Sequence, residues 1–349
     1  MIRNHTIAEL LAREADKVSF PAQRALRRAS RRALLWEEEA ADVVKTGRSL
    51  TELNGIGPYI EKLIRGWVDS PPDEIESPAL RSDFLTLTEA RRILARTPNW
   101  SASVKGDLQV HTTWSDGEGS IEEMSVAARA RGYEYIAITD HSKGLKIAGG
   151  INEEQIEQQG KEIAAVNGSG SVTVLRSLEM NLNPQGQGDI SSSCLRKLDL
   201  VLGCFHSALR KLTDQTDRYV SALRNPDIQI LGHPRGRIYN FRTGLSANWK
   251  KVFDVAAELD KAVEIDGYPD RQDLSISLLK IAKKADCRIS LGTDSHAPSQ
   301  LRFMEFSAAA AFSAGIRASR ILNFLPKAEL LNWVDDVRHK SARASGRKT

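Results

Sequence analysis

Between residues 106 and 291 the sequence repeats one pattern, a short apolar or β-branched run followed by a longer polar stretch. The seven runs lie at 107–111, 135–139, 172–178, 198–202, 228–231, 262–265 and 288–291. Most of the stretches between them, such as 120–131, 152–166, 214–223 and 249–259, have the apolar spacing of amphipathic helices. Strands that alternate with helices are typical of a parallel sheet, and seven of them favour a barrel over an open sheet. We therefore predict an α/β barrel.

The first 70 residues have a different pattern. Their apolar residues, such as Ile7, Leu10 and Leu11, recur at helical spacing without the alternation of strands. Prolines between 71 and 98 then interrupt it. A chain of 349 residues is long enough for two domains. We predict the following units: a small all-α domain at 1–70, a linker at 71–104 with one short helix at 82–96, the barrel at 105–335, and a basic disordered tail at 336–349.

The composition is that of a globular protein, with 41% hydrophobic and 27% charged residues. No apolar run of about 18 residues exists, which argues against a membrane span, and the first twenty residues lack the apolar core of a secretory signal. The three cysteines are scattered, which argues against disulfides and against a thiolate zinc site. We expect a cytoplasmic protein without a membrane partner, and among oligomeric states we favour a monomer.

Five of the seven histidines follow predicted strands directly: His111, His141, His206, His233 and His296. Carboxylates stand at the same places: Asp116, Asp140, Glu179 and Asp294. The carboxyl ends of the strands of a parallel barrel meet on one face, so these side chains are expected to share a cleft. A single histidine there is more often a core or surface residue, but so many ionisable groups are costly to bury unless they are paired or bind metal. Imidazole mixed with carboxylate suits Zn, Mn or Fe.

The segments around these residues also resemble a known family. They read GDLQVHTTWSDG (106–117), ITDHS (138–142), LEMNL (178–182), GCFHS (203–207), GHPRGR (232–237), EIDGYPDRQD (264–273) and LGTDSH (291–296). In this order they are similar to the successive motifs of the PHP family, the polymerase and histidinol phosphatase domains, over about 105–315. The resemblance implies a distorted (β/α)₇ barrel of the PHP type, two to three divalent metal ions, and a phosphate-ester substrate. The implied metal ligands are His111, Asp116, His141, Glu179, His206, His233, Asp294 and His296.

One position departs from the family pattern. The first motif of the family usually reads His-x-His, and here its first position is Gln109. Strand alternation places Gln109 on the same face as His111, so its amide still points at the site as a weaker ligand. We predict that one metal is bound less tightly, or that the centre is dinuclear with a replaceable third ion. Loss of activity is the alternative.

Two cations held close together would lower the pKa of a bridging water and clamp the attacking and leaving oxygens of a phosphate ester. Three arginines, Arg235, Arg237 and Arg271, are candidates to bind the phosphoryl oxygens. The alternative for each is a solvated surface side chain. Asp140 is a candidate to orient a histidine by accepting its hydrogen bond, and ordinary structural hydrogen bonding is the alternative.

Residues 53–64, LNGIGPYIEKLI, resemble a helix-hairpin-helix motif. Gly55 and Gly57 would let the turn approach a nucleic-acid backbone, and the amides of the next helix would face a phosphate beside Lys62. Such contacts do not read sequence. Upstream, a basic stripe is formed by Arg24, Arg27, Arg28, Arg31 and Arg32. It is the expected footprint of DNA binding, with a solvated helix face as the alternative.

Residues 1–70 are similar to the small N-terminal domain of family X DNA polymerases, whose bacterial members carry a PHP domain at the other end. The polymerase palm has no room in a linker of about 30 residues, so we predict no polymerase activity. Relatives can have lyase activity through a lysine on the helix after the hairpin. The matching position here is Leu63, with Lys62 one place earlier, which argues against a lyase.

Three functions follow as hypotheses. The first is a metal-dependent phosphoesterase of DNA repair, either a 3′–5′ exonuclease or a 3′-phosphatase. The second is a small-molecule phosphatase of the histidinol-phosphate or nucleotide type. The third is a DNA-binding scaffold without catalysis.

Overall fold

A seven-stranded parallel sheet forms the centre of the structure, a computed structural model that describes residues 2–73, 75–170 and 172–344. The strands are β1 (Gly106–Val110), β2 (Tyr135–Ile138), β3 (Thr173–Asn181), β4 (Leu200–Cys204), β5 (Ile230–Leu231), β6 (Ala262–Asp266) and β7 (Arg288–Gly292). They are ordered as in the sequence, and every neighbouring pair is parallel. Val110 and Ser295 bridge the two edges, where the His111 amide donates to the Ser295 carbonyl at 2.8 Å. The predicted α/β barrel is therefore confirmed, and it is nearly closed.

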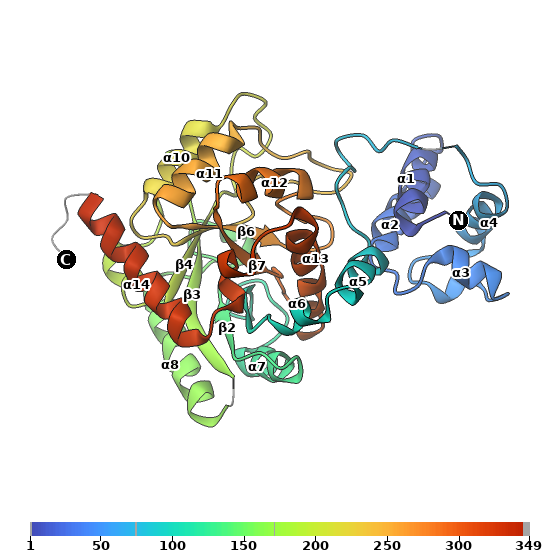
Figure 1. Ribbon diagram of the computed structural model, residues 1–349. Coiled ribbons are helices and arrows are strands. Elements are labelled where there is room, and N and C mark those ends of the chain that lie inside the picture. Colours follow the sequence, from blue (N-terminus) through green and yellow to red (C-terminus); the bar gives the residue numbers. More distant parts are fainter. Residues whose placement is uncertain (1, 74, 171, 345–349) are drawn as a thin grey trace.

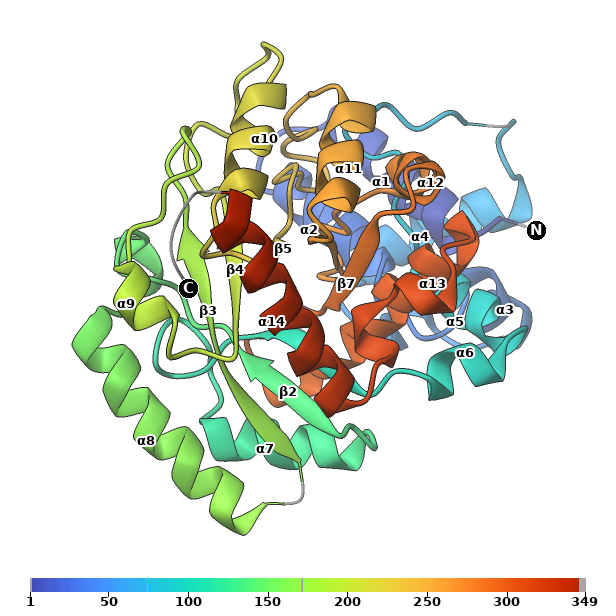
Figure 2. The ribbon, with the colours of Figure 1, turned by 60° about the vertical axis from the view of Figure 1, so that its left-hand side comes forward.

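Helices surround the sheet (Figures 1 and 2). They are α7 (Ile121–Ala130), α8 (Glu153–Ser169), α9 (Ser192–Leu195), α10 (Thr216–Arg224), α11 (Trp249–Glu258), α12 (Ile276–Lys284) and α13 (Met304–Ala314). Helices α7 and α8 both begin with a capping box, in which a side chain satisfies free amides of the first turn. Ile121 and Met124 of α7 then pack on the outer side of the sheet against Ile136. Local capping and apolar spacing therefore direct these two helices onto the barrel.

The last helix, α14 (Lys327–Ala344), closes the end of the barrel where the strands begin. It crosses the bundle of strands in Figure 2. Its buried residues Leu330, Trp333, Val334 and Val337 join the apolar interior of the barrel. The predicted disordered tail from residue 336 is therefore wrong as far as Ala344, because the apolar spacing of this helix continues past 335 and holds it on the barrel. Residues 345–349 lie outside the described residues.

The N-terminal helices form a second hydrophobic cluster beside the barrel (Figure 1). They are α1 (Asn4–Ala15), α2 (Ala22–Ala33), α3 (Ala40–Lys45), the 3₁₀ turn η1 (Leu50–Glu52) and α4 (Pro58–Asp69). The turn before α4 contains Gly55 with φ of 87°, a conformation that favours glycine. The connection to the barrel contains α5 (Leu87–Ala95), inside the predicted 82–96, and a further short helix, α6 (Pro98–Ala102), that was not predicted. Over the described residues, no helix is both long and apolar enough to cross a membrane.

The N-terminal helices contact the loop that follows β5, at the carboxyl ends of the strands. The Tyr239 hydroxyl lies 3.0 Å from Ser30 Oγ of α2, and the Tyr239 ring packs against Phe84 at 5.1 Å. Arg81 pairs with Glu9 of α1 at 2.7 Å and donates to Asn240 Oδ1 at 2.9 Å. Helix α2 is therefore held at the same face of the barrel on which strand-end residues gather.

A lysine buried where β6 begins makes stability depend on pH. Only 1% of Lys261 is exposed, its Nζ donates to the Asn225 carbonyl, and burial lowers its pKa from 10.5 to about 7. Between these values the unfolded chain binds more protons, so stability rises with pH, by at most about 1.4 kcal/mol per pH unit. We expect the wild type to gain stability relative to Lys261→Met from pH 7 to 10 in urea unfolding. If the free energy of unfolding changed with pH in the same way in both proteins, Lys261 would not be buried in its neutral form.

Candidate metal centre

The side chain of Glu179, near the carboxyl end of β3, lies at the centre of a buried cluster of imidazoles. Its Oε1 is 2.6 Å from His233 Nε2 and 2.9 Å from His206 Nε2. Its Oε2 is 3.2 Å from His111 Nε2 and 3.5 Å from His141 Nδ1. Glu179 itself is completely buried. Four strand ends therefore deliver histidines to one carboxylate, in the arrangement expected of a bridging ligand.

Two aspartates complete the cluster. Asp294 Oδ1 lies 3.0 Å from His111 Nε2. Asp116 Oδ1 lies 3.4 Å from His296 Nε2 and 3.5 Å from His141 Nε2. The structure thus brings together all eight residues that the family resemblance implied as ligands. Together with Cys204, which was not among the implied ligands, their atoms form four overlapping groups with the spacing of metal ligands: His111, Asp116, His141 and His296; His141, Glu179 and His206; Glu179, Cys204 and His233; and His111, Glu179 and Asp294.

Hydrogen bonds fix the tautomer of two of these histidines. His296 Nδ1 lies 2.7 Å from the Asp294 carbonyl, which can only accept, so Nδ1 carries the proton. His206 Nδ1 lies 3.1 Å from Asn181 Oδ1 and donates in the same way. In both rings the lone pair is therefore on Nε2, the atom that faces the cluster. Asn181, on β3 two residues beyond Glu179, was missed because amide side chains at strand ends carry no distinctive sequence signal.

Electrostatics in the cluster follow from burial and pairing. Against the effect of burial, the surrounding imidazoles, with His141 and His233 foremost, hold the pKa of Glu179 well below its usual range. The nearby carboxylates of Asp294 and Glu179 likewise outweigh burial and raise the pKa of His111. Burial lowers the pKa of His141 to about 3, which keeps this imidazole neutral at physiological pH. The cluster thus combines the ionised carboxylate of Glu179 with the neutral imidazole of His141, and a bound cation would be coordinated by groups in these two states.

Gln109 points into this cluster as predicted, and the two polar atoms of its amide have different surroundings. Its Nε2 donates to Glu179 Oε2 at 3.1 Å, whereas its buried Oε1 has no hydrogen-bond partner among the described residues. Gly292 of β7 allows this approach, since a Cβ there would lie 2.9 Å from Gln109 Cβ. Gln109 therefore holds the central carboxylate by a neutral hydrogen bond.

Asp140 is buried behind the cluster and accepts hydrogen bonds from a loop and a helix. Its donors are the Thr112 amide at 2.8 Å, Thr112 Oγ1 at 2.6 Å, Ser115 Oγ at 2.5 Å and Gln159 Nε2 at 2.7 Å. The prediction that Asp140 orients a histidine is therefore corrected. Asp140 shapes the loop after β1, which carries Asp116, because its oxygens are occupied by loop hydroxyl and amide groups.

Carboxylates on β6 lie next to the cluster and had no predicted role. Glu264 Oε2 accepts from the His233 amide at 2.7 Å, and Glu264 Oε1 has no partner among the described residues. Burial raises the pKa of Glu264 to about 8 and that of Asp266 well above its usual range. The sequence did contain a signal for these two carboxylates. Glu264 and Asp266 alternate along a strand, within a motif that is similar to one of the family, so strand alternation would place both on one face of the sheet.

The three predicted arginines lie in different surroundings. Arg271 Nη1 contacts Asp294 Oδ2 at 2.8 Å, and about a third of the side chain, 32%, is exposed. Arg235 instead donates to the carbonyl groups of Thr243 and Leu245. Arg237 is buried, stacks over the Phe84 ring at 3.7 Å, and donates to the carbonyl groups of Arg271 and Asp83. Of the three, the structure brings only Arg271 to the cluster.

Because Arg237 joins the linker to the barrel, its removal is expected to lower stability. Arg237→Ala loses two hydrogen bonds and buried packing, a cost of about 2–4 kcal/mol in the free energy of unfolding measured in urea. Arg224→Ala, at an exposed position of α10, is the control. If Arg237→Ala kept the unfolding midpoint of the wild type but bound phosphate more weakly, Arg237 would instead bind the phosphoryl oxygens, as predicted from sequence.

One independent observation indicates that the cluster can hold divalent cations. Several of its buried polar atoms have no hydrogen-bond partner among the described residues. Among the described residues these atoms include His111 Nε2, His141 Nδ1, His206 Nε2 and both carboxylate oxygens of Asp294. Buried polar atoms are rarely left in this state unless a bound group satisfies them. The donor set of imidazole and carboxylate suits Zn, Mn or Fe.

The sequence pattern of the PHP domain matches residues 107–293, more than half of the chain and the whole of this cluster except Asp294 and His296. The chain belongs to the PHP family. Its enzyme class is therefore that of the metal-dependent phosphoesterases, which hydrolyse phosphate ester bonds.

Similar proteins differ in their named activities. The chain is 34% identical to the DNA polymerase/3′-5′ exonuclease PolX of Bacillus subtilis (strain 168), over 63% of this chain and 39% of that protein. It therefore spans well under half the length of this relative. It is 28% identical to a probable phosphatase of Caldicellulosiruptor saccharolyticus, over 51% of this chain and 73% of the other. A histidinol phosphate phosphatase structure from Lactococcus lactis, with zinc, L-histidinol and phosphate, covers 61% of this chain and 95% of its own, with a TM-score of 0.47 and 17% identity.

The residues predicted to bind DNA lie on the N-terminal helices. Gly57 caps α4, Gly55 lies in the turn before it, and Lys62 is exposed on α4. Arg28 and Arg31 are exposed on α2. The exposed Arg27 contacts Asp16 at 3.3 Å.

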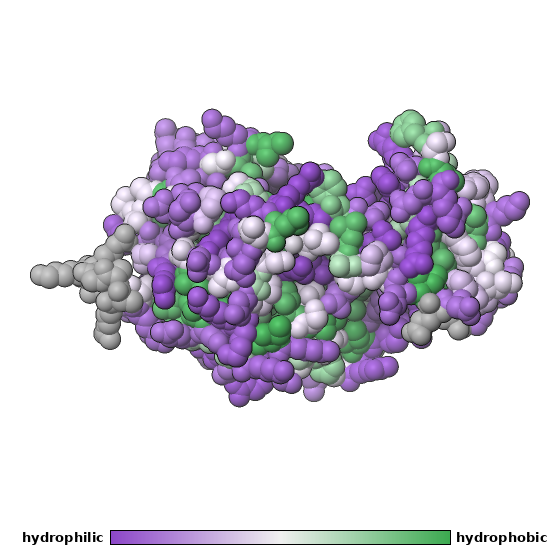
Figure 3. Space-filling model, turned by 90° about the horizontal axis from the view of Figure 1, so that it is seen from above, coloured by the Kyte–Doolittle hydropathy of each residue, from purple (hydrophilic) through white to green (hydrophobic). Residues whose placement is uncertain are grey.

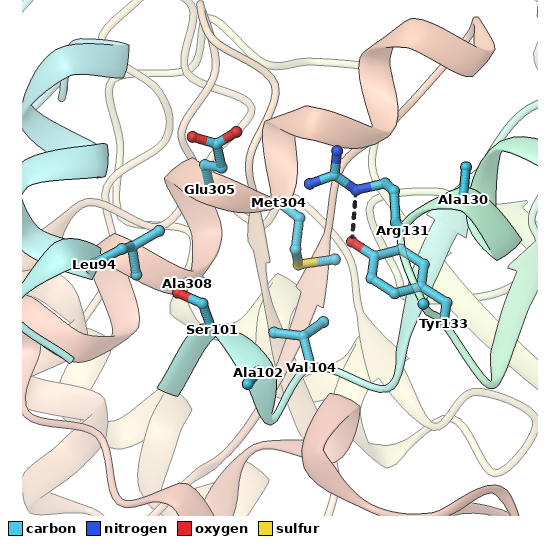
Figure 4. Close-up of a pocket in the computed structure, with 11 residues that line it drawn as sticks. Leu94, Ser101, Ala102, Val104, Ala130, Arg131, Tyr133, Met304, Glu305 and Ala308 are labelled. Carbon is cyan, nitrogen blue, oxygen red and sulfur yellow. Dashed lines mark hydrogen bonds between the residues drawn. The ribbon is translucent and has the colours of Figure 1, made fainter. Parts of the chain in front are cut away.

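Cavities also occur away from the cluster. One of about 350 Å³ lies between α6, the end of α7 and the start of α13 (Figure 4). Arg131 there donates to the Tyr133 hydroxyl at 3.3 Å. None of its lining residues belongs to the metal cluster: Leu94, Ser101, Ala102, Val104, Ala130, Arg131, Gly132, Tyr133, Met304, Glu305 and Ala308.

Proposed function

We propose that this protein is a metal-dependent phosphoesterase that acts on DNA ends, as a 3′–5′ exonuclease, a 3′-phosphatase or both. One observation carries the proposal. The arginine-rich helix α2 contacts the loop after β5, at the face of the barrel where the histidine and carboxylate cluster lies. A phosphate-ester site and a basic surface on one face suit a polyanionic substrate.

The residues that would hold the metals are His111, Asp116, His141, Glu179, His206, His233, Asp294 and His296. Bound divalent cations would supply a water of lowered pKa and neutralise charge on the phosphoryl oxygens. Glu179 is shared by three of the four ligand groups, so it would bridge cations. Gln109 would keep Glu179 in place by its hydrogen bond, which favours a centre with two tightly held ions over three.

Arg271 would bind and orient the phosphate. One nitrogen of its guanidinium contacts Asp294, and the side chain is partly open to solvent beside the cluster. A planar guanidinium can hold a carboxylate with one edge and offer further N–H groups to phosphoryl oxygens. Asp294 would thus fix both a cation and the arginine that meets the substrate.

The N-terminal part would hold DNA without reading its sequence. We assign residues 1–70 to a helix-hairpin-helix domain, 71–104 to a linker and 105–344, which include all of α14, to the barrel. In this domain the turn at Gly55 and Gly57 leads into α4, whose N-cap makes no side-chain hydrogen bond, so the amides that follow Pro58 would be available to a phosphate. Lys62 and the α2 arginines would add charge on the same domain.

The test uses purified protein supplied with Mn or Zn and 5′-labelled DNA ending in a 3′-hydroxyl or a 3′-phosphate. We expect the wild type to shorten the strand or remove the phosphate, and the product ladder to tell the two apart. His206→Ala protein from a parallel purification controls for contaminating nuclease. DNA that stays intact with metal present, or binding without any hydrolysis, would overturn the proposal, the latter in favour of a DNA-binding scaffold.

A small-molecule phosphatase is the second candidate, favoured by the relatives that are named probable phosphatases. It would hydrolyse histidinol phosphate or a nucleotide, and the N-terminal domain would be structural. In the same assay, turnover of these monoesters by a protein that leaves DNA intact would favour this candidate.

A further inference from the structure

We propose that the cavity between helix α2 and the loop after β6 binds a single strand of DNA immediately next to the end that reacts. This inference rests on the proposed function and adds to it the path that a DNA strand takes from the metal cluster towards α2. The cavity measures about 330 Å³, within the size range of ligand sites. Seen from above, the surface is indented between the barrel and the N-terminal helices (Figure 3).

One wall of the cavity is cationic. Arg28, Arg31 and Arg32 of the N-terminal part line it. Among the described residues none of the three forms an ion pair, in contrast to Arg27, which contacts Asp16 on the same helical hairpin. Arg32 also runs along the hairpin turn, where a Cβ on Gly55 would lie 2.6 Å from its Cδ. Three unpaired guanidinium groups that converge on one cavity are suited to phosphates.

The opposite wall comes from the barrel and is largely apolar. It consists of Tyr268, Pro269 and Phe303, with Asp270 as its acidic member. Burial raises the pKa of Asp270, while the charges of Arg271 and Arg31 act in the opposite direction. An aromatic wall that faces cations fits a nucleotide unit, because a base can lie on rings while its phosphate meets arginine. A free phosphate would not use the apolar wall.

Tyr268 connects this cavity to the metal cluster. Its ring lies 6.2 Å from the His296 ring and 5.4 Å from the Phe303 ring, centroid to centroid. The Arg271 guanidinium, which contacts Asp294, lies 5.9 Å from the same tyrosine ring. A strand whose terminal phosphate reaches the cluster would therefore pass Tyr268 and place its next phosphates beside α2.

Binding tests the path without hydrolysis. The His206→Ala protein and its Arg28→Ala/Arg31→Ala derivative are titrated into a fluorescent single-stranded DNA hexanucleotide and followed by anisotropy. We expect the derivative to bind roughly tenfold more weakly or worse, with a salt slope smaller by about 0.7 for each phosphate that is no longer neutralised. A Lys17→Ala/Lys45→Ala derivative removes the same charge elsewhere in the N-terminal part, just after α1 and at the end of α3. Equal weakening in both derivatives would overturn the site in favour of general electrostatics.

Kinetics provide the second measurement. With 3′-phosphorylated DNA of one to six nucleotides, we expect the wild-type KM to fall as the strand reaches α2 and then to level off. In Arg28→Ala/Arg31→Ala this dependence on length should disappear, while the single nucleotide keeps its KM. A wild type without DNA hydrolysis would refute the proposed function, and the anisotropy result would still decide the binding site. Equal length dependence in both proteins, or binding within twofold, would overturn the inference.

Discussion

Replacing Glu179 by glutamine is expected to lower kcat for phosphate-ester hydrolysis by ~10³-fold or more, as for loss of a central group in a metal site that acts as a unit. The substitution keeps the size of the side chain and removes its charge. The carboxylate lies within 3.5 Å of four imidazoles. An amide cannot bridge cations in its place, so bound metal measured by elemental analysis should fall together with kcat.

The control for this substitution is Glu157→Gln, which removes the same charge from the surface of α8, where Glu157 pairs with Lys197. It should leave metal content and kcat near those of the wild type. Glu179→Gln protein that retained both its metal and its kcat would show that the cluster is not the catalytic centre. Circular dichroism of both variants separates this result from a failure to fold.

The second large effect concerns stability. Trp333→Ala is expected to lower the free energy of unfolding by about 3–5 kcal/mol, the range for removing a buried large aromatic side chain. Trp333 is 4% exposed, packs into the apolar end of the barrel, and donates from Nε1 to the Asp260 carbonyl at 2.9 Å. Its loss would leave a cavity and an unsatisfied carbonyl at the end of the barrel that α14 closes.

Urea unfolding measures this effect, with Asn332→Ala at the neighbouring exposed position as the control. The control removes a side chain from the same helix without opening the interior, so its free energy of unfolding should stay within about 0.5 kcal/mol of the wild type. If Trp333→Ala unfolded at the same urea concentration as the control, α14 would not be part of the folding unit of the barrel.

The barrel and its cluster could be predicted because their signal is local and repeated. Each strand is marked by an apolar run, and the candidate ligands follow directly after these runs. Because the carboxyl ends of the strands of a parallel barrel meet on one face, the topology brings the candidate ligands together. The Gln109 position was also readable from strand alternation. Its hydrogen bond to Glu179 was not, because the contact joins two strands that are 70 residues apart.

Other features depend on tertiary contacts that a pattern does not encode. Arg237 follows His233 closely in sequence, but the backbone turns between them, and the guanidinium goes to the linker. The tail was predicted to be disordered because its polar residues dominate the sequence. The apolar residues of α14 are buried only because this helix covers the end of the barrel, which a local pattern does not reveal. The position of Tyr268 between the cluster and α2 likewise follows from tertiary contacts alone, since its ring lies near His296 and also lines the cavity beside α2.

The bonds of Arg237 bear on how such a chain can change in evolution. One guanidinium is shared between Asp83 of the linker and Arg271 of the loop that reaches the cluster. Grafting this barrel onto another N-terminal partner would remove an acceptor and the Phe84 ring, and would leave a buried cation next to the loop that carries Arg271. The two halves therefore do not behave as interchangeable modules. A recombinant that exchanges one half would need compensating changes at residue 237 before the loop that carries Arg271 could be held in place.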